Sequence, residues 1–155
     1  MVNFSVITLI GLFGLVGVWL SDHIRRKRVS KEDLVCPIGF DCQTVVTSKY
    51  SKFFGIPVEN LGILYYLLVS ISYAVFLFFP KLHHEFFSFA ILSVTILAFL
   101  FSIYLTFIQL VVLGRLCSLC LASAALCTLI FIFAWTSTNL DIIGFLNSVI
   151  QILPL

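Results

Sequence analysis

Four of the five cysteines in this chain fall into two pairs whose spacing suits thiol–disulfide chemistry. Cys36 and Cys42 bracket a short segment, and Cys117 and Cys120 form a CxxC motif. Cysteines three apart on a helix project from one face, and in the first turn they lie near unpaired N–H groups and the positive end of the helix dipole. Both influences favour the thiolate, the species that attacks a disulfide. The sequence therefore predicts a reactive, reversible pair at Cys117 and Cys120.

The other pair lies in a segment that favours a turn. Pro37 and Gly39 separate Cys36 from Cys42, so the two sulfurs can close a small loop and remain mobile enough to reach another partner. Such a pair, alternating between an external dithiol and the fixed CxxC, would pass a disulfide outward and electrons inward. A lipid-soluble quinone, such as ubiquinone or menaquinone, is the two-electron acceptor expected inside a bilayer. We expect it to lie among aromatic side chains beside Cys120.

Less specific interpretations stand beside this one. Four cysteines can bind structural zinc, although the five residues between Cys36 and Cys42 exceed the usual spacing of zinc ligands. Cysteine in a membrane helix is also a common small hydrophobic residue, and we assign Cys127 to core packing. We interpret His83–His84 as a solvated turn, because no other histidine or cysteine is near. The alternative to a redox enzyme is thus a structural or zinc-stabilised membrane protein.

Composition places these cysteines in a membrane. Hydrophobic residues make up 61% of the chain and charged residues 10%, and the mean hydropathy is +1.17. These values lie far outside the range of soluble domains. Uncharged stretches long enough for crossings of about 20 residues predict an all-α integral membrane protein, with a four-helix transmembrane bundle as the single domain 1–155. The predicted spans are residues 4–20, 60–79, 86–113 and 116–136.

The remaining segments connect or follow these spans. In the loop 21–59, Asp41 is expected to cap a short helix over 42–53 that lies over the bundle near the interface. The first span is expected to be retained, because no basic residue precedes it and no small-residue cleavage site follows it. Residues 139–155 are short for a crossing and predict an interfacial helix or a partial span. Counting the crossings places the loop and the 114–116 turn on the same side of the membrane, where the cysteine pairs can meet.

Charge argues against two classes of function. A net charge of +2 is too small to indicate a nucleic acid as partner. A transporter is disfavoured, because no ionisable residue interrupts the predicted spans. Membrane lipid and another protein therefore remain as the expected partners.

Further motifs accompany the cysteines in a fixed order. In this chain they are Cys36-x5-Cys42, Ser48, Tyr50-Ser51, Gly55-Ile56-Pro57, Gly62, Tyr65-Tyr66, Tyr104-Leu105-Thr106 and Cys117-Ser118-Leu119-Cys120. Over roughly residues 30–130 this ordered set resembles the vitamin K epoxide reductase family, especially prokaryotic homologues without a fused thioredoxin domain.

The resemblance implies roles for five residues within a four-helix bundle that surrounds a quinone and is capped by the loop and its short helix. Cys36 would meet the external thiol partner, and Cys42 would relay electrons to Cys117. Cys120 would face the quinone and reduce it, while Ser48 would assist near the loop cysteines. Prokaryotic members oxidise a thioredoxin-like protein that introduces disulfides into folding proteins. Because no such domain is fused here, the expected partner is a separate thioredoxin-like protein.

One departure limits what the resemblance implies. Animal members carry a tyrosine four residues after the second CxxC cysteine, where this chain has Ala124, so epoxide reduction is not implied. The chain differs from the other four-cysteine, quinone-linked membrane family, which resembles the bacterial disulfide-bond oxidant of inner membranes. That family has its CxxC in the first loop and a widely spaced pair in the second, the reverse of the order here.

The charges at the membrane edges bear on orientation. The side that carries the cysteines holds most of the basic residues, namely Arg25, Arg26, Lys27, Arg28, Lys31, Lys49, Lys52 and Arg115. The opposite side holds Lys81, so the positive-inside rule favours a cytoplasmic active site. Family members usually place the site outside, where disulfides persist. We expect a multi-pass cell-membrane protein with its active site on the exterior face.

Overall fold

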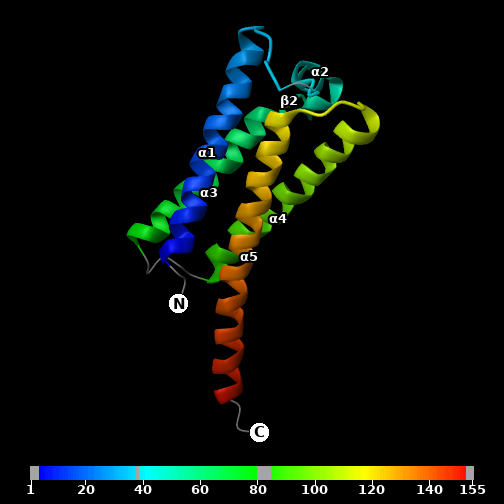
Figure 1. Cartoon of the computed structure of the whole chain (residues 1–155). Coiled ribbons are helices and arrows are strands. Elements are labelled where there is room, and N and C mark those ends of the chain that lie inside the picture. The colour runs from blue at the N-terminus through cyan, green and yellow to red at the C-terminus, as the bar shows by residue number, and fades with distance from the viewer. Residues whose placement is uncertain (1–3, 38, 80–84, 153–155) are drawn as a thin grey trace.

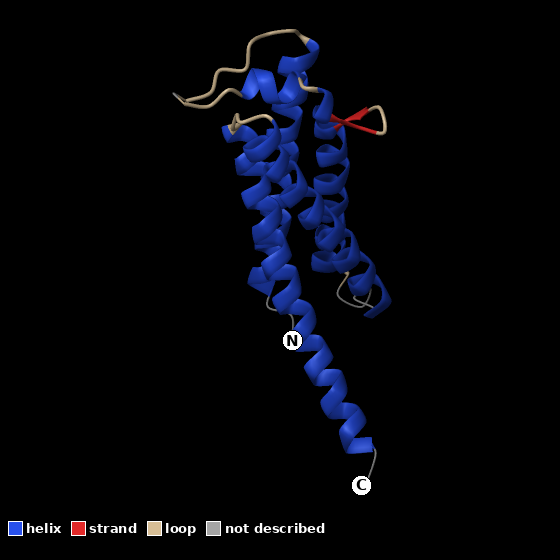
Figure 2. Ribbon diagram, turned by 90° about the vertical axis from the view of Figure 1, so that its right-hand side faces the viewer, coloured by secondary structure: helices blue, strands red, loops and turns tan. Residues whose placement is uncertain are grey.

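The computed structural model describes the backbone of residues 4–37, 39–79 and 85–152, and the side chains of 4–37, 39–79 and 87–137. The described chain is built on long helices packed side by side (Figures 1 and 2). They are α1 (Phe4–Val29), α3 (Val58–Phe78), α4 (Glu85–Phe107), which continues into a π-helical turn at Ile108–Val112, and α5 (Ser118–Ile152). Helix α4 is inclined to the others in Figure 1. The pair His83–His84 and Lys81 lie outside the described residues.

Each long helix contains a segment long and apolar enough to cross a membrane. By length and composition these segments are Phe4–Val29, Val58–Phe78, Phe87–Val112 and Ser118–Ser137. Large apolar side chains on the outer faces, such as Leu64, Leu100 and Phe107, are more than half exposed. Hydrocarbon solvates such side chains, and a helix satisfies its own backbone hydrogen bonds there. The predicted four-helix membrane bundle is therefore confirmed.

Two helices extend beyond the predicted spans. α1 continues through the basic run to Val29 instead of ending at residue 20. The positive charges end the crossing but not the helix, because cations in a last turn complement the helix dipole. α5 continues to Ile152, so the predicted break before a separate 139–155 segment is wrong. At 1.5 Å per residue α5 is roughly 52 Å long, and its C-terminal part projects past the bundle (Figure 1).

The helix pair α1 and α3 packs closely because small residues lie between them. A Cβ added at Gly17 would lie 2.4 Å from the ring of Tyr66, and one added at Gly14 would lie 2.3 Å from Ser70 Oγ. Small residues are a common means of close helix approach in membranes. Tyr66 is thereby buried in the core of the bundle beside Ile10.

A compact cap covers one end of the bundle (Figures 1 and 2). Asp41 caps α2 (Cys42–Thr47) as predicted, since its carboxylate accepts hydrogen bonds from the Thr44 N–H at 3.1 Å and from the Thr44 hydroxyl at 2.8 Å. The predicted extent, 42–53, is wrong. The backbone at Ser48 is extended, and a 3-10 turn (Lys49–Ser51) follows.

A small antiparallel hairpin completes the cap, and its first strand lies where the sequence predicted the end of the short helix. Its strands are β1 (Lys52–Phe53) and β2 (Ile56–Pro57), with Phe53 paired to Ile56. Phe54 and Gly55 between them both have positive φ, 50° and 81°, the backbone that a tight two-residue hairpin turn requires. The Phe53 ring packs on Phe101 of α4 with centroids 5.1 Å apart. The hairpin is thus held against the membrane bundle.

Candidate functional site

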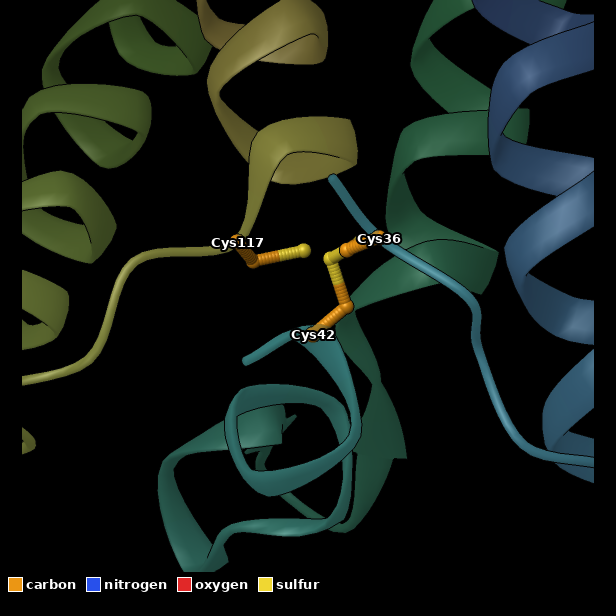
Figure 3. A group of neighbouring side chains, drawn as sticks. All are labelled: Cys36, Cys42 and Cys117. Carbon is orange, nitrogen blue, oxygen red and sulfur yellow. A yellow bond between two sulfur atoms is a disulfide. The ribbon is translucent and has the colours of Figure 1, made fainter. Parts of the chain in front are cut away.

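Three of the four paired cysteines meet beneath the cap. Cys36 and Cys42 form a disulfide with their Cα atoms 6.1 Å apart. The sulfur of Cys117 points toward this disulfide, and the three sulfurs all lie within 4.8 Å of one another (Figure 3). Cys42 and Cys117 are buried, whereas Cys36 is only partly so. The expectation that the loop and the CxxC turn lie together is confirmed.

Hydrogen bonds dock the cysteine loop on the segment that leads into α5. The Asp41 N–H donates to the Leu116 carbonyl at 2.9 Å. The Asp41 carboxylate also lies 3.9 Å from the Arg115 guanidinium. Within the loop itself, the Leu34 N–H donates to Gln43 Oε1 at 3.3 Å and joins the segment before the disulfide to α2. These contacts place the loop disulfide directly against Cys117.

Cys117 immediately precedes α5 and acts as its cap. The predicted helix start at residue 116 is therefore two residues early. The N–H of Cys120, in the first turn, donates to Cys117 Sγ at 3.3 Å, and the Cys117 N–H donates to Gln109 Oε1 at 3.2 Å. Hydrogen bonding with the Cys120 side chain, supported by the backbone N–H groups of Cys120 and Leu119, lowers the pKa of Cys117 to about 7 against the opposing effect of burial. Cys120 is thus the main group that favours the thiolate of Cys117, and the backbone N–H groups at the helix start add to its effect.

This shift predicts the pH at which Cys117 becomes reactive. We expect the thiolate to predominate above about pH 7 and to be lost as pH falls through that value, instead of titrating near the ordinary value of 9.0. Thiolate absorbance of the reduced protein, measured against a Cys117→Ser variant, reports the midpoint. In Cys120→Ala the midpoint should move toward 9.0, because the largest favourable contact is gone. A midpoint that stays near 7 in that variant would show that Cys120 is not the cause.

Ser118 is a functional candidate that sequence reasoning missed. It is the first residue of α5, and its hydroxyl donates to Cys36 Sγ at 3.3 Å and lies 3.8 Å from Cys42 Sγ. A hydroxyl in this position can stabilise the negative charge that forms on a sulfur when the disulfide opens. Its place between the two CxxC cysteines was the available signal, but the sequence did not show that it faces the other pair.

Replacing Ser118 tests this role. We expect Ser118→Ala to slow reduction of the loop disulfide about tenfold, because a hydrogen bond to a charged group contributes about 1.5–3 kcal/mol. The measurement is the rate at which a small dithiol reduces Cys36–Cys42 in oxidised protein. Ser118→Thr, which keeps the hydroxyl, is the matched control and should retain most of the rate. Equal rates in the alanine variant and the unmodified protein would contradict the role.

Cys120 lines a cavity of about 360 Å³. The cavity lies among α1, α3, α4 and α5 and is covered by the end of α2 and the 3-10 turn. Its wall is mostly apolar, with aromatic residues Tyr50, Tyr65, Tyr66 and Phe101. Cys117 is not among the lining residues. The two cysteines of one motif therefore face two different places, the loop disulfide and the cavity.

Two other candidates from the sequence also line this cavity. Cys127 is buried, as core packing requires, but it contributes to the cavity wall as well. Ser48 lies in the wall at the end of α2, and its hydroxyl donates to the Val45 carbonyl at 2.8 Å. Among the described contacts of Ser48 there is no hydrogen bond to a loop sulfur. Its assisting role stays a prediction.

A largely buried ion pair lies near the cap, with Glu59 in the cavity wall, and the sequence analysis did not identify it. The Arg28 guanidinium donates to both Glu59 carboxylate oxygens, at 2.7 and 2.9 Å, and to the Ser51 hydroxyl at 3.1 Å. The side chains of Arg28 and Glu59 are 18% and 6% exposed. Arg28 stood in a basic run and Glu59 at a span boundary, so neither position indicated a partner. The pair joins the end of α1, the 3-10 turn and the start of α3.

The sulfur cluster also has the donor chemistry of a metal site. Cys36, Cys42 and Cys117 each offer one sulfur within a common 4.8 Å. A structural zinc ion takes four ligands, and the group found among the described residues has three. In the disulfide form two of these sulfurs are bonded to each other. A metal would therefore bind the reduced form.

Comparison with known proteins identifies a family. The family model described as "Vitamin K epoxide reductase family" matches residues 5–135. This range contains both cysteine pairs and nearly all of the four membrane-spanning segments. The search of curated proteins found no match.

Proposed function

Because the chain belongs to the vitamin K epoxide reductase family, a family of oxidoreductases, we propose that it passes electrons from a thioredoxin-like partner through two cysteine pairs to a lipid-soluble quinone. The observation that carries this proposal is the division of the CxxC motif. Cys117 lies against the loop disulfide, and Cys120 lines the apolar cavity. One motif thus contacts both the thiol side and the membrane side. Turnover in this direction would support disulfide-bond formation.

The first half of the reaction takes place at the loop. A thiolate of the partner's dithiol attacks Cys36, the partly exposed sulfur of the Cys36–Cys42 disulfide, and the partner's second thiol displaces it. The partner leaves with a disulfide, and Cys36 and Cys42 become thiols. Exposed Val35 and Pro37 flank Cys36, whereas Cys42 is 1% exposed. This difference favours Cys36 as the point of contact with a protein partner.

The second half moves the electrons inward. The Cys42 thiolate attacks Cys117 of a Cys117–Cys120 disulfide, and Cys36 then displaces Cys117 from the mixed disulfide. The loop disulfide re-forms, and the CxxC becomes a dithiol, which matches the cysteine states of the structure. Cys117 and Cys120 then close their disulfide and release two electrons and two protons to a quinone, which becomes a quinol. Ser48, in the cavity wall, is proposed to support the loop side of this exchange.

The cavity has the properties of a quinone site. Its volume of about 360 Å³ lies within the range of small-molecule pockets, roughly 300–1,000 Å³, and such pockets are mostly apolar with a few polar groups. Leu97 of α4 lines the cavity and is 67% exposed. We propose that the cavity opens to the lipid beside this residue. A quinone dissolved in the bilayer can enter by this route.

Titration of the reduced protein under anaerobic conditions tests the function. With ubiquinone or menaquinone as sole oxidant, we expect the paired thiols to be lost as quinol accumulates, one quinone for each disulfide formed. Metal analysis of the same purified protein tests the alternative. Stoichiometric zinc together with no loss of thiols on quinone addition would favour the structural protein.

We propose that the active site faces the exterior, the side where disulfides persist. A membrane-impermeant thiol reagent added to intact cells decides the point. Cys36 in its reduced state should be labelled without cell lysis, and labelling that requires lysis would place the site in the cytoplasm. A cytoplasmic site would agree with the positive-inside rule.

A further inference from the structure

The hydroxyl of Tyr65 is a buried polar group whose hydrogen-bonding capacity is not met within the described part of the chain. Tyr65 lies on α3 and lines the cavity together with Cys120. Its hydroxyl oxygen is buried and has no hydrogen-bond partner among the described residues. Thr95 and Cys127 are its polar neighbours, but neither meets hydrogen-bond geometry, and the Thr95 hydroxyl donates to the Ile91 carbonyl at 2.9 Å. An unpaired buried hydroxyl costs about 1–3 kcal/mol, so a donor in a cavity wall calls for a ligand that accepts from it.

The adjacent tyrosine shows the contrast. The Tyr66 hydroxyl donates to the Ser123 carbonyl at 2.8 Å and lies 2.9 Å from the Ser123 hydroxyl. Its ring packs against the backbone at Gly17, where a Cβ would lie 2.4 Å away. The hydroxyl of Tyr66 therefore has its hydrogen-bond partner within the protein. Of the two neighbours, Tyr65 is the one whose hydroxyl has no hydrogen-bond partner among the described residues.

The position of Tyr65 relative to Cys120 suits a ring with an oxygen at each end. Cys120, Ser123, Ala124 and Cys127 line the cavity from one face of α5, at the helical spacing of three, four and seven residues. Cys127, the neighbour of Tyr65, lies roughly 10 Å along the helix axis from Cys120. The reacting sulfur and Tyr65 are thus at different depths of the cavity wall. A quinone lying between them can present one carbonyl to each.

We propose that Tyr65 is a quinone-binding residue whose hydroxyl donates a hydrogen bond to a ring carbonyl. The inference rests on the proposed function and deepens it, because it specifies the group that recognises a quinone in preference to a hydrocarbon of the same shape. The bond orients the ring in the cavity with its other end toward Cys120. It also strengthens as negative charge develops on the carbonyl oxygen during reduction.

A pair of shape-matched ligands tests the hydrogen bond directly. One is a dimethylnaphthoquinone whose free ring positions are methylated, so that thiols cannot add to it. The other is the corresponding dimethylnaphthalene, which lacks both oxygens. Equilibrium binding is measured with fully oxidised protein, which holds no electrons to transfer. We expect Tyr65→Phe to weaken naphthoquinone binding about fivefold to tenfold, the scale of one net hydrogen bond, and to leave naphthalene binding unchanged.

Tyr66→Phe is the matched control. It removes a hydroxyl that is already bonded within the protein, so it should lower thermal stability and change the affinities of both ligands by the same factor. If Tyr65→Phe leaves naphthoquinone binding unchanged, or weakens both ligands equally, the role of Tyr65 is wrong and the proposed function stands. If the unmodified protein binds no naphthoquinone and its thiols survive quinone titration, the proposed function fails and the inference with it.

Discussion

Cys120→Ala is expected to abolish quinone reduction while leaving the loop disulfide open to reduction by a dithiol. Cys120 is the only one of the four paired cysteines in the described wall of the cavity. Removing an enzyme's nucleophile lowers turnover by roughly a thousandfold or more. Cys36→Ala should give the complementary result, because it removes the accessible sulfur at which a protein partner attacks. Turnover with the partner stops, but a chemically reduced CxxC still transfers one pair of electrons to quinone.

The two half-reactions are measured separately. Stopped-flow mixing of reduced variant with quinone reports the inner half, and thiol–disulfide exchange with an oxidised or reduced thioredoxin-like protein reports the outer half. Cys127→Ala is the matched control for Cys120→Ala, since it removes another sulfur from the same cavity wall. This control variant keeps both CxxC cysteines and is expected to form their disulfide. Full quinone reduction by Cys120→Ala, or full partner turnover by Cys36→Ala, would refute the relay.

Arg28→Ala is expected to destabilise the protein by about 3–5 kcal/mol, because it leaves the buried Glu59 carboxylate without its partner. The same change separates the end of α1 from the 3-10 turn, where Arg28 also binds Ser51. Since these elements enclose the cavity, quinone affinity should fall as well. Thermal unfolding in a bilayer mimetic measures the first effect, and equilibrium binding measures the second.

An exposed ion pair on the same helix supplies the control. Arg26 lies 2.6 Å from Asp22, but its side chain is 79% exposed, and such surface pairs contribute about 0–1 kcal/mol. Arg26→Ala should therefore leave the unfolding transition nearly unchanged. Replacing both members of the buried pair by apolar residues should recover much of the stability lost in Arg28→Ala. Equal destabilisation by Arg28→Ala and Arg26→Ala would show that burial of the pair does not matter.

The membrane spans and the meeting of the cysteine pairs were predictable because they depend on local properties. Twenty or so apolar residues cross a bilayer whatever their neighbours are, and the number of crossings decides which loops share a side. The wrong predictions lie in segments that mix polar and apolar residues. Residues 48–53 contain no strong helix breaker, yet the extended Ser48 and the positive φ of Phe54 and Gly55 produce a turn and a hairpin. The polar residues after 137 do not interrupt α5, because polarity ends a crossing without ending a helix.

By itself, the sequence determined the class of the protein: four apolar helices, two cysteine pairs on one side, and motifs of a thiol oxidoreductase family. Only the tertiary structure placed Cys117 against the loop disulfide and Cys120 in the wall of the cavity. Spacing places Cys117 and Cys120 on one helix start, but the docked loop and the cavity give them separate neighbours. The same holds for Ser118 at the disulfide, Arg28 at Glu59 and the buried hydroxyl of Tyr65. Each depends on contacts between segments far apart in the chain, which helix packing creates and local sequence does not encode.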